Sequence, residues 1–345
     1  MPENAHGEIR VSETSAALAS RGAFSATVRY RVQGGEKTLL LRRFAPTEDE
    51  AKSALLTDLA RRLAPSGTEV QAPMSGEEAV NVVGSALTAF RTFANWLHDN
   101  PNRSVLPESN AASDIALTGT DIVPKGIIEG LLGSVSDHLD AWVNLVDRGG
   151  DDPVMQLHLF ADFTMLRPVV EALASIVWVL GDERQELRIR RALLIGNAEL
   201  RHTQRFLDAL NAAGLSDDAL AYSSTNLEEL LVEAAESAGL APTKALPAQP
   251  TDPTAIVRGA GQYVRGPSLD TFRHWALCSS HAHGQIVGVL THASRTIGAS
   301  ADGSLYSHAE VDTRHLAETL RFIGDKLLPT AVNLLNKRGF IAAPD

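Results

Sequence analysis

The alternation of hydrophobic and polar residues divides the chain into a short β-rich front segment and a long helical remainder. In the front segment, residues 26–44 alternate apolar with polar or basic residues, and Gly34-Gly35 supplies a turn between the two halves. This pattern predicts a β-hairpin with one apolar face and one basic face. A helix is expected from Thr47, because Thr47 and Glu50 form a capping box before an apolar stripe. The stripe consists of Ala51, Leu55, Leu59 and Leu63.

From residue 75 onward, apolar residues recur at the three- and four-residue spacing that is typical of α-helices. This spacing predicts helices at 76–99, 122–147, 152–181, 183–213, 226–239, 254–264, 269–297 and 311–338. A Pro-rich linker is expected at 241–254, and the segment SLYSH near 304–308 is the only later one expected to be extended. The fold class is therefore mainly α: a multi-helix bundle domain at 75–345, preceded by a small β-hairpin/helix (α+β) module at 1–74.

One predicted helix, 269–297, places polar residues on its apolar side. Ser279 and His283 share the spacing of an apolar stripe, whose other members are Phe272, Ala276, Ile286 and Leu290. Buried polar groups without partners cost roughly 1–3 kcal/mol, so we expect other core residues to meet this pair. The neighbouring His281 is a second candidate for the inward-facing histidine. Cys278 is expected to be a small buried residue rather than a nucleophile.

Two further predicted helices add charged candidates to this polar centre. Arg167 and Glu171 lie four residues apart, a spacing that lets the two charges meet. Pro168 is expected to bend that helix. Arg191 falls on the apolar side of the next helix, where a buried arginine needs a carboxylate, and Glu171 or Glu199 is the expected partner.

The charge of the chain is unevenly distributed. The formal net charge is −11, yet residues 1–72 carry 10 Lys and Arg against 9 Asp and Glu, so the negative excess lies behind the front segment. The single cysteine excludes an internal disulfide framework and favours a reducing, cytoplasmic location. The N-terminus lacks the pattern of a signal peptide, and the longest apolar run, 172–180, is too short to span a membrane.

The front segment resembles the arm-site DNA-binding domain that opens many actinobacterial tyrosine-type integrases. The resemblance rests on basic strands, a helix, and the sequence APSGTEVQAPMS leading into a new helix. It implies that a small sheet presents basic residues to the DNA major groove, namely Arg29, Arg31, Lys37, Arg42 and Arg43. Recombinase catalysis is not expected, because about a hundred residues separate His202-x-x-Arg205 from Tyr306, far more than that family allows.

Residues 120–340 resemble a group of actinobacterial helical proteins that are distantly similar to the HEPN class. The resemblance is carried by R-P-x-x-E at 167–171, the arginine-rich helix that follows, and SSHAHG at 279–284. It implies arginine and histidine at the centre of a helical bundle. The Arg-x4-6-His motif of the HEPN ribonucleases is absent, because seven residues separate Arg273 from His281.

Three functional hypotheses follow. The first is a binding or regulatory protein of a mobile-element or defence type, which contacts DNA or RNA through its front module, forms a homodimer through its helical domain and needs no cofactor or metal. The second is a metal-independent ribonuclease or other hydrolase, in which His283 or His281 is the general acid/base and Arg167 or Arg191 stabilises negative charge beside Glu171. The third is a di-iron carboxylate bundle, built from Glu171, Glu199-x-x-His202 and Asp312-x-x-His315.

Overall fold

The computed structural model describes residues 7–12, 23–32, 35–44, 76–99, 105–147, 155–158, 160–284, 293–299, 305–311 and 313–340. The chain divides into two compact units, Met1–Ser75 and Gly76–Asp345. The described part of the second unit is mainly helical, which confirms the mainly α fold class.

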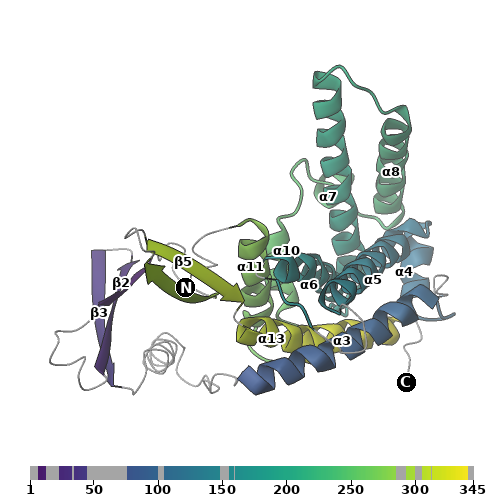
Figure 1. Cartoon of the computed structure of the whole chain (residues 1–345). Helices are drawn as coiled ribbons and strands as arrows, with labels where there is room; N and C mark the ends of the chain where they lie inside the picture. The colour runs from purple at the N-terminus through teal and green to yellow at the C-terminus, as the bar shows by residue number, and fades with distance from the viewer. Residues whose placement is uncertain are drawn as a thin grey trace. The chain divides into compact units, whose positions relative to one another are not determined.

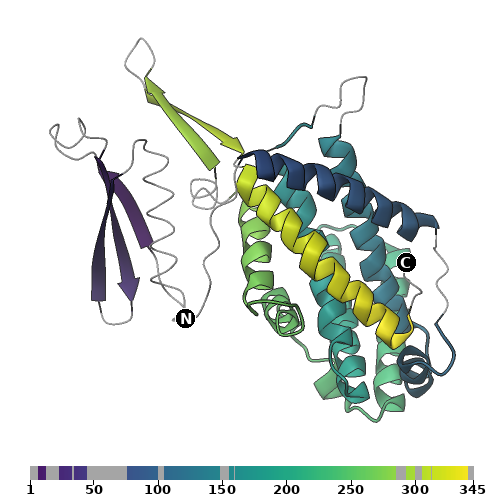
Figure 2. The same ribbon diagram turned by 90° about the horizontal axis from the view of Figure 1, so that it is seen from below.

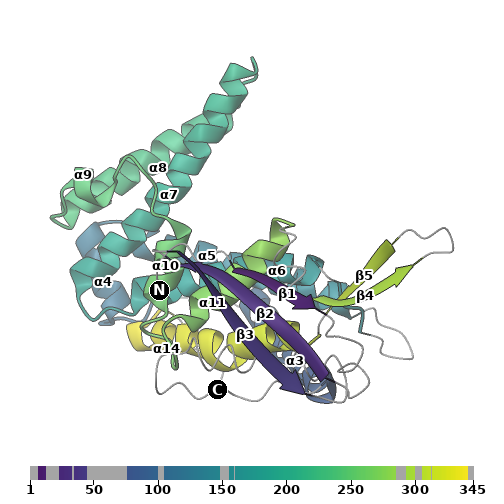
Figure 3. The same cartoon turned by 90° about the vertical axis from the view of Figure 1, so that its left-hand side faces the viewer.

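The described part of the first unit is a three-stranded antiparallel sheet. Strands β1 (Gly7–Ser12), β2 (Ala23–Val32) and β3 (Gly35–Phe44) lie side by side in that order, with β2 in the middle (Figure 3). Strand β1 was not predicted, although GEIRVS alternates polar and apolar residues as β2 does. The helix expected from Thr47 lies outside the described residues.

The second unit is built from helices of very different lengths. Its helical elements are α3 (Gly76–Asp99), α4 (Asn110–Thr118), η1 (Ile122–Gly126), α5 (Ile127–Val146), α6 (Ala161–Leu180), α7 (Gln185–Ala212), α8 (Asp218–Ser237), α9 (Pro242–Ala245), α10 (Pro253–Ala260), α11 (Asp270–Ala282), α13 (Thr313–Phe322), η2 (Ile323–Leu327) and α14 (Leu328–Arg338). Strands β4 (Ala293–Ala299) and β5 (Leu305–Val311) pair antiparallel. Figure 2 shows α3 lying alongside α13.

Helix α6 is the centre of the helical unit. It lies beside α5, α10 and α11 (Figure 1) and also packs against α14. Most of its side chains are buried. Among the described helices it is the one whose length and apolar composition match those of a membrane-crossing helix. A helix at the centre of a protein core has the same composition, because it is covered on several sides. Pro168 lies inside α6.

The end of α6 and the corner that follows it are held by arginine side chains from later in the chain. The last carbonyl groups of a helix lack partners within the helix and form the negative end of its dipole, so cations are favoured there. Arg338 donates to the carbonyl of Leu180 at 3.1 Å and to that of Asp182 at 2.9 Å. Arg188 donates to the carbonyl of Glu183 at 2.7 Å. Both arginines are almost fully buried, so the α6–α7 corner is fixed by hydrogen bonds as well as by packing.

Several helix boundaries differ from those expected. The helix predicted at 269–297 ends at Ala282, because Gly284 adopts a positive φ of 60° and its N–H bonds to the carbonyl of His281. Residues 293–297 of that predicted helix belong to β4, where Thr296 and Ile297 favour extended backbone. The extended segment expected near 304–308 corresponds to β5.

Four further differences concern the starts of α6 and α8, the short helix α4 and the Pro-rich linker. Helix α6 was expected from residue 152 but begins at Ala161, after a stretch in which Met155 bridges to Asp147. Helix α8 was expected at 226–239 but begins at Asp218, because Asp217 caps it by accepting the N–H of Leu220. Helix α4 was not predicted, and the expected Pro-rich linker contains the short α9.

Candidate functional site

The structure brings part of the predicted polar centre together along the contact between α6 and α11. We call the residues Phe163, Arg167, Glu171, Trp275 and His281 the α6–α11 strip. Arg167 Nε lies 3.8 Å from Glu171 Oε2, as their four-residue spacing predicted. Trp275 Nε1 donates to the same carboxylate oxygen at 3.1 Å, and the ring of His281 stacks on Phe163 with centroids 4.2 Å apart. The strip therefore combines two half-buried charges with a buried imidazole.

The buried face of α11 differs from the face that the sequence predicted. Thr271, His274, Cys278 and His281 are buried, whereas Ser279 is half-buried and His283 is exposed. His283 caps the C-terminal end of α11, where its backbone N–H bonds to the carbonyl of Ser279 at 3.1 Å. The expected inward pair Ser279 and His283 is therefore wrong, and His281 is the inward histidine of the SSHAHG segment.

Burial controls the protonation of the polar groups on α11. The pKa of His274 falls to about 3, mainly because burial disfavours the charged imidazole, with a smaller contribution from the nearby Arg273. Burial also lowers the pKa of His281. The pKa of the Cys278 thiol rises to about 12 because the side chain is completely buried. Cys278 is therefore a protonated packing residue, as the sequence predicted.

Arg191 lies at the other end of α6. Its guanidinium donates to the carbonyl of Trp178 at 2.6 Å and to the Tyr263 hydroxyl at 3.0 Å, and it lies over both aromatic rings. Its acidic partner is Asp182, whose Oδ2 lies 3.6 Å from Arg191 Nη2. The partners that the sequence predicted, Glu171 and Glu199, do not fill this role. Hydrogen bonds from Arg184 are the main reason why the pKa of Asp182 is lowered to about 2.

This position separates Arg191 from the α6–α11 strip. Trp178, which Arg191 contacts, is fifteen residues along α6 from Phe163, which His281 contacts. At 1.5 Å per residue, the two ends are about 22 Å apart. The structure therefore does not unite Arg191 with either His281 or His283 in one site, and Arg191 instead supports the C-terminal end of α6.

The arginine that is fully buried on α7 is Arg188, which was not among the predicted site residues. Arg188 forms a two-point contact with Asp114 of α4, with N–O distances of 2.9 Å and 2.7 Å. Both side chains are almost completely buried. Seventy-four residues separate the two partners, so nothing in the local sequence pattern pairs them.

The residues proposed for a di-iron centre do not converge in the structure. Glu171 pairs with Arg167 and Trp275, whereas Glu199 and His202 are exposed on α7. Within the described ranges, no group of three or more His, Cys, Asp or Glu side chains lies close enough to hold a metal ion. Asp312 lies outside the described residues. The placement of Glu171, Glu199 and His202 does not support that hypothesis.

The strand pairing of the front sheet divides the five basic candidates between its two faces. Arg29 pairs with Thr38, and Arg42 pairs with Ser25, so Arg29, Arg31 and Arg42 occupy positions of one face. Lys37 and Arg43 are paired with Tyr30 and Phe24 and occupy positions of the opposite face. The three-stranded register also brings Arg10 of β1 onto the first face, opposite Thr27. We call the positions of Arg10, Arg29, Arg31 and Arg42 the arginine face.

No protein-family model matches the chain. The comparisons with curated proteins and with solved structures also give no match.

Proposed function

We propose that this chain is a nucleic-acid-binding regulatory protein of a mobile-element or defence type. In this proposal the first unit is the small α+β module of residues 1–74, which contacts duplex DNA through the arginine face. The helical unit is the body that dimerises or binds a partner. The observation that carries the proposal is the register of β1, β2 and β3, which aligns four arginine positions on one face of the sheet.

The chemistry of that face suits a nucleic acid. Two glutamates, Glu8 and Glu36, share the face with the four arginines, so its formal charge is positive although the whole chain is acidic. Arginine can make paired hydrogen bonds to phosphates or to guanine edges, and the DNA major groove is wide enough to admit a two-stranded β-ribbon. The apolar residues Ile9, Val11, Val28 and Leu39 alternate with these positions and occupy the opposite face. A helix from Thr47 would cover that face.

The HEPN-like interpretation of the helical body stays part of this proposal. Burial of Arg188, Arg338, His274 and His281 supports a body with arginine and histidine inside it. The hydrolase alternative is restricted to the α6–α11 strip, because Arg191 lies at the opposite end of α6 and His283 is exposed.

A salt series with the full chain tests DNA contact. The protein is titrated into mixed-sequence duplex DNA, and into RNA of the same length, at several salt concentrations. We expect binding to DNA that weakens steeply with salt, because each neutralised phosphate contributes about −0.9 to the slope of log K against log salt. Arg29→Ala combined with Arg31→Ala should weaken binding at least tenfold and reduce the magnitude of the slope by about 2.

The two faces of the sheet provide a matched control. Lys37→Ala combined with Arg43→Ala removes the same two positive charges from the opposite face and should change affinity less than about threefold. Equal weakening by the two double variants would mean that net charge, and not the arginine face, governs binding. Absence of DNA binding at low salt would overturn the proposal. Tighter binding to RNA than to DNA would mean that RNA is the preferred ligand.

A further inference from the structure

The helical hairpin formed by α7 and α8 contains a polar cavity between its two helices. This hairpin projects from the rest of the helical unit in two perpendicular views (Figures 1 and 3). Near its outer end the helices leave a hollow of about 290 Å³. Since one water molecule occupies about 30 Å³ in the liquid, the hollow is large enough for a small ligand.

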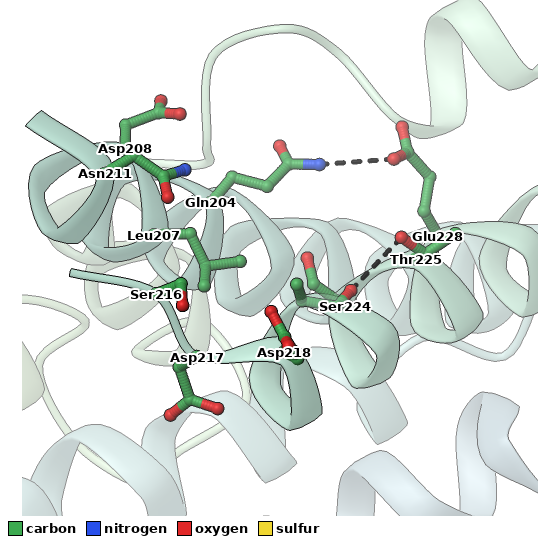
Figure 4. A pocket seen from close by; sticks show the side chains of 11 residues that line it. Gln204, Leu207, Asp208, Asn211, Ser216, Asp217, Asp218, Ser224, Thr225 and Glu228 are labelled. Carbon is green, nitrogen blue, oxygen red and sulfur yellow. Dashed lines mark hydrogen bonds between the residues drawn. The ribbon is translucent and has the colours of Figure 1, made fainter. Parts of the chain in front are cut away.

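The lining of the cavity is strongly acidic. Figure 4 shows Asp208 from α7, Asp217 and Asp218 from the start of α8, and Glu228 from further along α8. None of the described residues that line the cavity is a lysine, arginine or histidine. The C-terminal end of α7 and the N-terminal end of α8 lie together here, so their opposite dipoles offset each other. The four carboxylates therefore set the charge of the cavity, which favours a cation.

Two of these carboxylates are held in place by other groups. Arg201 donates to Gln204 Oε1 at 2.7 Å, and this contact orients the Gln204 amide so that its Nε2 donates to Glu228 Oε2 at 3.2 Å. Asp217 Oδ1 accepts the N–H of Leu220 at 2.9 Å as the N-cap of α8. The carboxylates of Glu228 and Asp217 are therefore held in position before any ligand binds.

A nearly buried serine residue in the lining points to a ligand independently of the charge. Ser224 is only 6% exposed, lines the cavity, and has no hydrogen-bond partner among the described residues. Its hydroxyl oxygen is not among the fully buried polar atoms, so it opens onto the cavity. The neighbouring Thr225, in contrast, satisfies its own hydroxyl by donating to the carbonyl of Ala221 at 3.1 Å. Ser224 is therefore placed to accept a hydrogen bond from a ligand in the cavity.

The spacing of the carboxylates favours an elongated organic cation over a metal ion. Asp218 and Glu228 are ten residues apart on one helix, which corresponds to about 15 Å. A metal ion requires several oxygen ligands within about 2.6 Å of one point. A linear molecule with several ammonium groups instead reaches both ends of the cavity and donates to Ser224 between them.

We propose that the α7–α8 cavity binds the alkylammonium groups of a linear polycation, either a free polyamine or the lysine side chains of a basic peptide. This site lies in the second unit, whereas the arginine face lies in the first, and the proposal does not rest on nucleic-acid binding. Each ammonium group would pair with a carboxylate of the lining and leave no positive charge uncompensated.

Isothermal titration calorimetry of the full chain with spermine tests this proposal. Asp218→Asn combined with Glu228→Gln should weaken spermine binding at least tenfold. Ser224→Ala leaves every charge in place and should weaken it about fivefold, the effect of losing one hydrogen bond of about 1 kcal/mol. The same titration with a tetralysine peptide identifies the source of the ammonium groups. Tighter binding of spermine would indicate a free polyamine, and tighter binding of tetralysine would indicate a basic peptide.

A second double variant separates the cavity from general surface charge. Glu229 and Glu236 are exposed on α8 outside the cavity lining, so Glu229→Gln combined with Glu236→Gln removes the same charge and should leave binding within twofold. Equal weakening by the two double variants overturns the proposal. Absence of binding by both polycations, or Mg²⁺ binding that depends on Asp218 and Glu228, also overturns it. Circular dichroism of each variant verifies that α7 and α8 remain folded.

Discussion

At the scale of single residues, burial gives His274 a measurable effect on stability. Its Nδ1 lies 3.2 Å from Thr319 Oγ1, and its ring stacks on Phe322 with centroids 4.5 Å apart. Its pKa is about 3 in the folded protein and about 6.5 in the unfolded chain. Between these values only the unfolded chain binds the proton. The free energy of unfolding therefore falls as the pH drops below about 6.5, by up to about 1.4 kcal/mol per pH unit.

Urea denaturation of the wild type and of His274→Gln at several pH values measures this contribution. Glutamine carries no titrating proton, so the variant should show a shallower loss of stability between about pH 6.5 and 4. The lowered pKa of His281 acts in the same direction and remains in both proteins. His202→Gln, at an exposed position of α7, is the control and should leave the slope unchanged. An unchanged slope in His274→Gln would contradict the prediction.

At the scale of elements, α11 distinguishes the two histidines that the sequence placed together. His281 is buried and stacked on Phe163, so His281→Ala removes packing and should cost about 1–3 kcal/mol of unfolding free energy. His283 is exposed at the helix end, so His283→Ala should change stability by less than about 0.5 kcal/mol. Urea denaturation at neutral pH measures both. The reverse order of effects would show that His283 is the packed residue.

The same helix shows what the sequence could and could not predict. The periodic pattern located the helices that became α3, α5, α7 and α14, because long apolar stripes and flanking Gly or Pro define them well. The pattern predicted the wrong buried face for α11. Two of its four buried positions are histidines, which do not stand out as apolar, and the apolar residues after Gly284 favoured a stripe through Ser279 and His283. It also selected Arg191 over Arg188, because the partner of Arg188 is Asp114, which only tertiary packing brings near.

At the scale of the whole molecule, the division into two units predicts that the helical unit is stable by itself. It has its own core around α6, and its first helix, α3, begins at Gly76, where the second unit starts. A chain of residues 76–345 should therefore unfold in one cooperative transition. Its Tm should lie within about 4 °C of the main transition of the full chain, the shift that about 1 kcal/mol causes in a unit of this size.

Differential scanning calorimetry of the truncated and full chains measures this expectation. The two proteins should share one transition with the same enthalpy, because the contacts of α6 with α5, α10, α11 and α14 are retained. The Arg29→Ala/Arg31→Ala full chain is the control and should keep that transition, since its substitutions lie in the first unit. A truncated chain that melts much lower, or without cooperativity, would mean that residues 1–75 complete the helical core. The arginine face and the α7–α8 cavity would then belong to one folding unit, and variants of either site would alter the stability of both.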